Sequence, residues 1–130
     1  QRVYTVISDG ECDEGSNWEA FLFAAHHHLE NLTVIVDYNQ IQCFGRTNEV
    51  LNLEPLADKF KAFNWQVLEM AGHNLPEIVQ TLALAKSLAK PTVIIAKTVK
   101  GKGVDFMENT IDWHFNKLTI EYLEIALKQL

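Results

Sequence analysis

The chain has 130 residues, of which 48% are apolar and 22% are charged, as expected for one globular domain rather than a disordered or fibrous protein. Its formal net charge of -6 argues against a general affinity for nucleic acid or for an anionic membrane surface, because both repel an acidic domain. No apolar run approaches the roughly 18 residues that a membrane-spanning helix needs, and no signal-peptide pattern begins the chain, so we expect a soluble, cytoplasmic protein.

Two strand patterns separated by a helix pattern make up the first part of the chain. Residues 3–7 and 32–36 are rich in β-branched and apolar residues, which is typical of strands buried in a sheet. Ser16 and Glu19 have the spacing of a capping box, which predicts the start of a helix of about 13 residues. Its inward-facing residues are predicted to be Trp18, Phe21, Leu22 and Ala25. Because a strand begins almost at the first residue, we expect upstream sequence to belong to the same domain.

The later elements continue this alternation of helices and strands. They are predicted as a polar loop over 37–47 with a turn at Gly45, a helix over 53–63, a strand over 65–70, a helix from Pro76 to about Leu88, a strand over 91–96, a basic turn over 100–103, a loop over 105–117 and an amphipathic C-terminal helix over 118–130. Such alternation predicts an α/β fold of three layers, α/β/α, with helices on both faces of a mostly parallel sheet. We expect residues 1–130 to form a single domain.

Polar residues follow the first two predicted strands, where α/β proteins usually bind ligands. Asp9 offers a carboxylate, Asn39 an amide oxygen, and the loop at Ile41 a main-chain carbonyl. Hard divalent cations such as Mg²⁺ prefer oxygen ligands and share their coordination shell with phosphate oxygens. Gly10 has no side chain to keep a phosphate from the backbone N–H groups, and the helix that follows would add its positive N-terminal end. Alone, Asp9 and Gly10 would equally be an ordinary turn, but together with Asn39 they predict a site for a cation and a diphosphate.

These two segments resemble the thiamine diphosphate signature, in which Gly-Asp-Gly is followed at a similar distance by Asn. Several other motifs are similar to those of the transketolase family and occur in the same order. They are Asp13-Glu14-Gly15 with Trp18-Glu19-Ala20, Asp37-Tyr38-Asn39-Gln40-Ile41, Gly72-His73, and Lys100-Gly101-Lys102-Gly103 followed by Trp113-His114. The resemblance covers residues 1 to about 117 and is strongest to the separately encoded N-terminal subunits of split transketolases. It implies the thiamine diphosphate-binding fold.

The resemblance implies a role for each matching residue. Asp9, the Asn39 side chain and the main-chain carbonyl of Ile41 would bind Mg²⁺ or Ca²⁺, and this ion would hold the diphosphate of the cofactor. Gly10 would contact the diphosphate through its backbone. The other matches are Lys100, which would bind the cofactor, His114, which would be a catalytic and cofactor-binding histidine near the substrate oxygens, and Glu14, which would lie at a dimer interface and act indirectly.

The activity that the resemblance implies is the transfer of a two-carbon ketol unit between sugar phosphates, as part of carbohydrate metabolism. In the family, an upstream histidine and Gly-rich turn, and a glutamate from a pyrimidine-binding second domain, complete the active site. These groups lie outside the 130 residues. We therefore expect a homo- or hetero-oligomer with a pyrimidine-binding transketolase C-terminal subunit or domain, and little or no activity without that partner.

Two departures from the family pattern affect these expectations differently. Ser8 replaces the first Gly of the usual triplet, which adds a side chain beside the metal loop but leaves Asp9 and Gly10 intact. After Trp113 and His114, the usual Gly-Lys continuation is replaced by residues 115–117, Phe-Asn-Lys. We therefore carry over no substrate-phosphate lysine from that segment, and the sugar substrate stays open.

Other functions compete with this one. The chain also fits another thiamine diphosphate enzyme, such as a 2-oxo acid dehydrogenase subunit or a specialised sugar ketolase, or a non-catalytic structural or assembly remnant of the fold. A nucleotide-binding Rossmann domain is disfavoured, because residues 8–13 lack Gly-x-Gly-x-x-Gly spacing. Calorimetric titration with thiamine diphosphate and Mg²⁺, with and without a partner subunit, distinguishes these possibilities.

Simpler interpretations apply to several conspicuous side chains. Successive helical residues point about 100° apart, so the run of histidines at 26–28 is expected to be a surface feature rather than a metal cluster. The aromatic residues Trp18, Phe21, Phe23 and Trp65 are expected in the core. Cys12 and Cys43 lack the spacing of a zinc or redox pair and are expected to be idle thiols. His73 fits a cap of the following helix, with a role at the edge of the site as the alternative that its family match implies. His114 fits an ordinary loop histidine as the alternative to its functional role.

Overall fold

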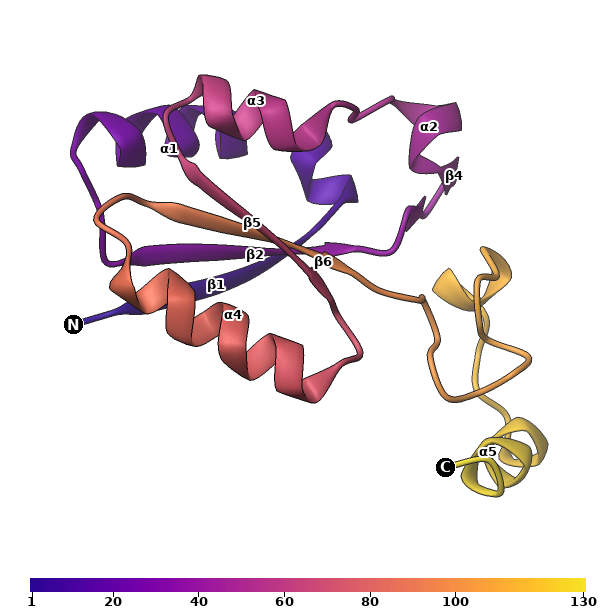
Figure 1. Ribbon diagram of the computed structural model, residues 1–130. Helices are drawn as coiled ribbons and strands as arrows, with labels where there is room; N and C mark the ends of the chain where they lie inside the picture. Colours follow the sequence, from indigo (N-terminus) through magenta and orange to yellow (C-terminus); the bar gives the residue numbers. More distant parts are fainter.

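Four parallel strands form one sheet in the computed structural model, which describes residues 1–130 (Figure 1). The strands are β1 (Val3–Ser8), β2 (Leu32–Tyr38), β5 (Gln66–Ala71) and β6 (Thr92–Lys97). Their order across the sheet is β1-β2-β6-β5, and every neighbouring pair is parallel. Each predicted strand is present, and the predicted α/β class with a parallel sheet is confirmed.

Helices cover both faces of this sheet, as the alternating pattern predicted. Helices α1 (Gly15–His26) and α3 (Leu56–Ala62) lie on one face, and α4 (Leu75–Ser87) lies on the other (Figure 1). Strand β6, one of the two inner strands, packs against helices on both faces because successive side chains point in opposite directions. Val93 and Ile95 pack in the cluster that contains residues of α1 and α3. Ile94 and Ala96 pack in the cluster that contains residues of α4.

Aromatic rings fill the layer between the sheet and the helices α1 and α3. Phe60 is fully buried, and its ring centroid lies 5.4 Å from that of Trp18 and 4.9 Å from that of Phe21. The indole N–H of Trp65 donates to the Phe21 carbonyl at 2.9 Å, which leaves this buried polar group satisfied. The cluster fixes α1 and α3 on the sheet and confirms the core prediction for Phe21 and Trp65.

Strand β1 is more exposed than its composition predicted. It lies at the edge of the sheet, and the exposed fractions of Val3, Tyr4 and Val6 are 46%, 47% and 67%. The prediction of a buried strand over residues 3–7 was therefore wrong in its burial, although right in its extent. Apolar composition indicates that a strand forms, but its burial also depends on whether it lies inside the sheet or at its edge.

Several local boundaries differ from the prediction. The capping box at Ser16 is not formed, because α1 begins earlier, with Glu14 as its N-cap and without a side-chain cap. Pro55 precedes α3, so that helix is shorter than predicted and the short helix α2 (Thr47–Val50) forms before it. The loop after β2 contains a hairpin of β3 (Ile41–Gln42) and β4 (Gly45–Arg46). Gly45 lies in β4, just after the turn.

Beyond β6 the chain forms turns, a short 3-10 helix, η2 (Asp112–His114), and the helix α5 (Ile120–Leu127), which lies apart from the three layers (Figure 1). Gly101 has a φ of +73°, and a Cβ there would lie 2.4 Å from the Met107 carbonyl oxygen. Only glycine fits such a conformation without strain. The rings of Phe106, Trp113 and Tyr122 pack against one another, with centroid distances of 4.9 to 5.2 Å.

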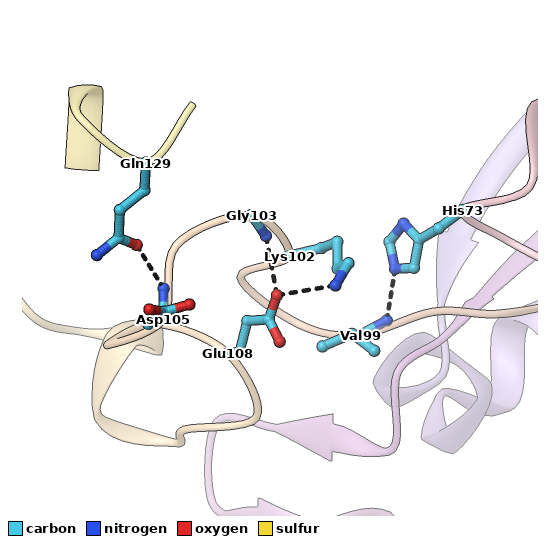
Figure 2. Close-up of polar contacts among 7 residues, drawn as sticks. All are labelled: His73, Val99, Lys102, Gly103, Asp105, Glu108 and Gln129. Atoms are coloured by element: carbon cyan, nitrogen blue, oxygen red, sulfur yellow. Dashed lines mark hydrogen bonds and ion pairs between the residues drawn. The ribbon is translucent and has the colours of Figure 1, made fainter.

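Polar contacts hold this C-terminal segment in place (Figure 2). The Glu108 carboxylate accepts from the Gly103 N–H and from the Lys102 ammonium, both at 3.0 Å. The Asp105 N–H donates to the Gln129 side-chain oxygen at 2.7 Å, which connects the turn to the end of the chain. These bonds give the basic turn over 100–103 a defined conformation. The predicted C-terminal helix is present but shorter than residues 118–130.

The prediction that His73 caps α4 was wrong. Asn74 is the N-cap, and its side chain accepts from the Glu77 N–H at 3.3 Å. His73 instead accepts the Val99 N–H at its Nε2 at 2.7 Å (Figure 2). It thereby fixes the segment that leads from β6 to Lys100.

Glu54 supports the entry to α3 and gives a pH-dependent prediction. It accepts from the Tyr38 hydroxyl and, at 3.0 Å, from the Leu56 N–H, and these bonds lower its pKa below the ordinary 4.5. A lowered carboxyl pKa gives stability that is present above pH 4.5 and is lost as the pH falls through the folded-state pKa. We expect Glu54→Ala to lower the free energy of unfolding by about 1 kcal/mol at pH 7, because solvent screens this exposed carboxylate.

Urea unfolding at a series of pH values measures this effect. The deficit of Glu54→Ala should shrink as the pH falls below 4.5, the ordinary pKa of the group. Glu19→Ala, which removes an exposed glutamate on α1, is the matched control and should show no such deficit. A deficit of constant size from pH 7 to pH 3 would contradict the assignment.

None of the helices is both long enough and apolar enough to cross a membrane.

Candidate functional site

The candidate site lies where β1 and β2 end. Ser8 pairs with Asp37 in the parallel register, so Asp9 and Asn39 leave the sheet at neighbouring points of the same edge. A cavity of about 730 Å³ opens there. All the predicted site residues line it, namely Asp9, Gly10, Asn39, Ile41, Lys100 and His114. The fold thus brings together residues from four separate parts of the sequence.

Asp9 is the most buried carboxylate of the cavity, with an exposed fraction of 1%. One oxygen accepts from the Gly10 N–H at 2.8 Å, and the other accepts from the Gln40 N–H at 2.5 Å. Burial raises the pKa of Asp9 above its ordinary 3.8, and the two hydrogen bonds oppose this shift only in part. Each carboxylate oxygen keeps a free lone pair, so a cation would both ligate Asp9 and offset the unfavourable burial of its charge.

Asn39 lies in the turn between β2 and β3, and Ile41 is the first residue of β3. The Asn39 side-chain oxygen accepts from the Ile41 N–H at 3.0 Å. In the hairpin, the Thr47 N–H donates to the Gln40 carbonyl, and hydrogen-bonded and non-bonded pairs alternate in antiparallel ladders. Ile41, paired with Arg46, therefore occupies a non-bonded position, which leaves its carbonyl free to bind a ligand.

These oxygen atoms fit a hard divalent cation. No three His, Cys, Asp or Glu side chains are arranged to hold a metal by themselves. An oxygen shell here therefore depends on one carboxylate together with an amide oxygen and a main-chain carbonyl. That mixed donor set suits Mg²⁺ or Ca²⁺, and three protein ligands leave positions for diphosphate oxygens and water. Zn²⁺ is bound mostly through Cys and His side chains, and the set of Asp9, Asn39 and Ile41 contains neither.

Gly10 allows a close approach at the edge of this cavity. A Cβ at Gly10 would lie 3.3 Å from the Cβ of Gln42, so even a methyl group would crowd the hairpin. The turn that follows is the 3-10 helix η1 (Gly10–Asp13), and α1 begins only after it. The helix N-terminus that was predicted to attract a phosphate does not follow Gly10 directly. A short acidic turn, η1, lies there instead.

The charge of the cavity is predominantly negative. Five carboxylates line it, Asp9, Glu11, Asp13, Glu14 and Asp37, against one ammonium, that of Lys100. Lys100 forms none of the three ion pairs in the chain. An anionic ligand would be repelled from such a cavity in the absence of a bound cation. A diphosphate bound here would therefore need a compensating positive charge, such as that of a divalent cation.

The remaining predicted residues lie at the rim. Lys100 is half-buried, and its carbonyl accepts from the Asn109 N–H at 3.0 Å. His114 is exposed on η2, with its ring 4.9 Å from that of Phe115. Glu14 is exposed beside the cavity. These placements keep both His114 and Glu14 within reach of a ligand or of a further protein surface.

Sequence reasoning missed some residues that organise the site. Asp37 accepts from the Thr98 hydroxyl and from the Asn39 amide, the latter at 3.4 Å, and so orients Asn39. The side-chain amide of Gln42 donates to Asp13 at 2.9 Å. The position of Asp37 at the end of a strand was a usable signal for a role. Nothing in the sequence indicated the pairing of Gln42 with Asp13.

The histidine run, Phe23 and the two cysteines, to which the sequence analysis gave no functional role, differ in how well the predictions describe them. The histidine run at 26–28 is exposed, as predicted for a surface feature. Phe23 is 59% exposed, so its predicted place in the core was wrong. Cys12 is buried and Cys43 is half-buried, and both are free. Burial raises the pKa of Cys12 to about 12, which makes this thiol unreactive at neutral pH.

Comparisons with known proteins identify the family of the chain. The chain matches the family model "Transketolase, thiamine diphosphate binding domain" over residues 1–129. The 6-deoxy-6-sulfo-D-fructose transketolase subunit SqwG of Clostridium sp. (strain MSTE9) is 45% identical, with 98% of this chain and 47% of the relative covered. An apulose-4-phosphate transketolase subunit of Actinobacillus succinogenes is 40% identical, with 100% of this chain and 47% of the relative covered.

Solved structures show the same likeness. The crystal structure of transketolase from Campylobacter jejuni superposes with a TM-score of 0.93 at 34% identity, and the match covers 99% of this chain and 20% of that chain. The chain spans about half the length of the curated relatives from Clostridium and Actinobacillus.

Proposed function

Because the chain belongs to the transketolase family through its thiamine diphosphate-binding domain, we propose that it holds thiamine diphosphate through a divalent cation. In this proposal, Asp9, the Asn39 side-chain oxygen and the Ile41 carbonyl are the protein ligands of Mg²⁺ or Ca²⁺. Gly10 contacts the diphosphate through its backbone. The observation that carries the proposal is that these residues line one acidic cavity where β1 and β2 end.

The acidity of the cavity supports the metal as part of the proposal. Diphosphate is an anion, and the five carboxylates would repel it unless a divalent cation were bound between them. Asp9 gives the clearest support for a bound cation, because burial raises the pKa of its carboxyl. A buried carboxylate is unfavourable in the free chain and becomes favourable when a cation neutralises it.

Lys100 and His114 also line the cavity and would contact the bound ligand. The Lys100 ammonium is a point charge suited to a diphosphate, and no carboxylate in the chain pairs with it. The cofactor, when bound, supplies a thiazolium carbanion that adds to carbonyl carbons. His114 would then donate a hydrogen bond to a substrate oxygen or exchange a proton with it, the two roles open to an imidazole side chain.

Removing the Lys100 charge should weaken cofactor binding selectively. We expect Lys100→Gln to lower the affinity for thiamine diphosphate, measured at saturating Mg²⁺, by about tenfold, which corresponds to about 1.4 kcal/mol. Lys86→Gln is the matched control, because Lys86 is exposed on α4, forms none of the ion pairs in the chain and does not line the cavity. Isothermal titration of both variants provides the measurement. Equal losses in the two variants would argue against a specific role for Lys100.

We extend the proposal to the whole enzyme. The similar proteins from Clostridium and Actinobacillus are transketolase subunits by name. The chain would accordingly work with a pyrimidine-binding subunit or domain, in a homo- or hetero-oligomer, and transfer a two-carbon ketol unit between sugar phosphates. The name of the Clostridium relative includes a sulfonated sugar, so the anionic group of the substrate is either a phosphate or a sulfonate.

A reconstitution assay tests this transferase proposal. The chain is assayed with ketose phosphate or ketose sulfonate donors and an aldose acceptor, alone and after co-purification with the pyrimidine-binding partner. We expect no measurable ketol transfer by the chain alone and transfer by the complex that requires thiamine diphosphate and Mg²⁺. Cofactor binding without transfer in any complex would favour a structural or assembly role of the same fold.

A further inference from the structure

We propose that Asp13 and Gln42 are positioning residues that connect the two halves of the cation site and set its affinity for metal. This inference rests on the proposed function, because it assumes that Asp9, Asn39 and Ile41 are the metal ligands. Neither Asp13 nor Gln42 is among those ligands. They lie on different elements, η1 and β3, and both line the cavity.

The contact between them is direct. The Gln42 side-chain amide donates to one oxygen of the Asp13 carboxylate at 2.9 Å. Gln42 follows Ile41 directly in β3, and Asp13 ends the turn that begins at Gly10. The bond therefore connects the segment that carries the Ile41 carbonyl to the segment that carries Asp9.

A second contact and a second hydrogen bond also hold the Ile41 segment against the Asp9 segment. The Cβ of Gln42 lies so near Gly10 that an added methyl group there would be 3.3 Å away. On the other side of Ile41, the Gln40 N–H donates to Asp9 at 2.5 Å. Ile41 is thus held between two attachments, one at Gln40 and one at Gln42. Fixing a ligand on both sides preserves the spacing that a cation with a near-octahedral shell requires.

The unpaired oxygen of Asp13 indicates that its charge matters as well as its bond. The second carboxylate oxygen is buried and has no hydrogen-bond partner, although buried polar atoms in proteins are nearly always paired. An asparagine would accept the Gln42 hydrogen bond equally well without burying an unpaired charge. A carboxylate at this position adds to the negative field that draws a cation into the cavity, which explains why its unfavourable burial is tolerated.

A double-mutant cycle tests the inference without reference to catalysis. The probe is Mn²⁺ in the presence of inorganic pyrophosphate, followed by electron paramagnetic resonance of the free and bound ion. We expect Gln42→Ala, which removes the bond, to weaken Mn²⁺ binding by about tenfold. Asp13→Ala removes both the bond and the charge and should lose about 30-fold, and the double variant should be no weaker than Asp13→Ala, because residues acting as a unit are not additive. Asp13→Asn, which keeps the bond and removes the charge, should lose about threefold.

Controls separate this effect from loss of fold and from failure of the proposed function. Asp58→Asn removes one negative charge from an exposed ion pair on α3 and should leave Mn²⁺ affinity unchanged. Thermal unfolding should show that Asp13→Asn keeps wild-type stability, a result that a purely structural role would not combine with weaker metal binding. Wild-type Mn²⁺ affinity in the Asp13 and Gln42 variants, or additive losses, would overturn the inference while leaving the proposed function standing. Absence of Mn²⁺ binding in the wild-type chain would overturn both.

Discussion

Replacing Asp9 with alanine is expected to reduce the affinity for Mg²⁺-thiamine diphosphate by at least about 100-fold, since loss of an outer-shell partner alone costs a metal site about 10–100-fold. Asp9 is the only proposed metal ligand that carries a charge, and the acidic cavity would admit the diphosphate only with its cation. Isothermal titration with thiamine diphosphate at a fixed Mg²⁺ concentration measures the loss.

The same substitution should leave the fold nearly intact. Alanine removes a carboxylate whose burial is unfavourable in the free chain, but it also leaves the Gly10 and Gln40 N–H groups without their acceptor. These opposing effects should keep the change in unfolding free energy within about 1–2 kcal/mol. Asp58→Ala, at an exposed ion pair, is the control for charge. Wild-type affinity in a folded Asp9→Ala protein would show that the metal assignment is wrong.

Replacing Phe60 with alanine is expected to have the largest effect on stability, a loss of about 3–5 kcal/mol. Phe60 is 0% exposed, and its ring contacts Trp18, Phe21 and Trp65, with centroid distances from 4.9 Å to 6.0 Å. Removing the ring would leave a cavity between α3 and the sheet that these neighbours cannot fill without moving. Urea unfolding followed by tryptophan fluorescence measures the change.

Phe23→Ala is the matched control for this core substitution. Phe23 is 59% exposed, so its truncation should change the free energy of unfolding by less than about 1 kcal/mol. The molecules of the Phe60 variant that remain folded should bind the cofactor normally, because Phe60 does not line the cavity. Equal destabilisation by the two truncations would contradict the position of the aromatic core. Together, the Asp9 and Phe60 variants separate binding from folding.

Much of the site could be predicted because its residues follow strands whose pattern is plain in the sequence. In a parallel sheet, Asp9 and Asn39 come to the same edge once their strands are adjacent, which the register of Ser8 with Asp37 confirms. Lys100 and His114 could be placed only through family resemblance, because they lie in turns without periodicity. In the structure both residues line the cavity where β1 and β2 end, and their chemical roles stay predictions.

The features that escaped prediction depend on tertiary contacts. Ser16 has the sequence of a capping residue. The turn η1, which begins at Gly10, is followed by α1 from Gly15, so Ser16 already lies inside the helix and cannot cap it. The exposure of β1 depends on the order of strands rather than on their composition. The bond between Gln42 and Asp13 joins two segments whose separation in sequence conceals their contact. Local pattern predicts elements, whereas partners across elements require the fold.

We propose that this chain binds thiamine diphosphate only through a divalent cation held by Asp9, Asn39 and Ile41. Calorimetric titration of the purified chain with thiamine diphosphate, in the presence of Mg²⁺ and again in excess EDTA, tests this dependence on metal. We expect saturable heat with Mg²⁺ and none with EDTA, both for the chain alone and for any complex with its partner subunit. Equal binding without the metal, or no binding by the folded chain and its complex in either condition, would contradict it.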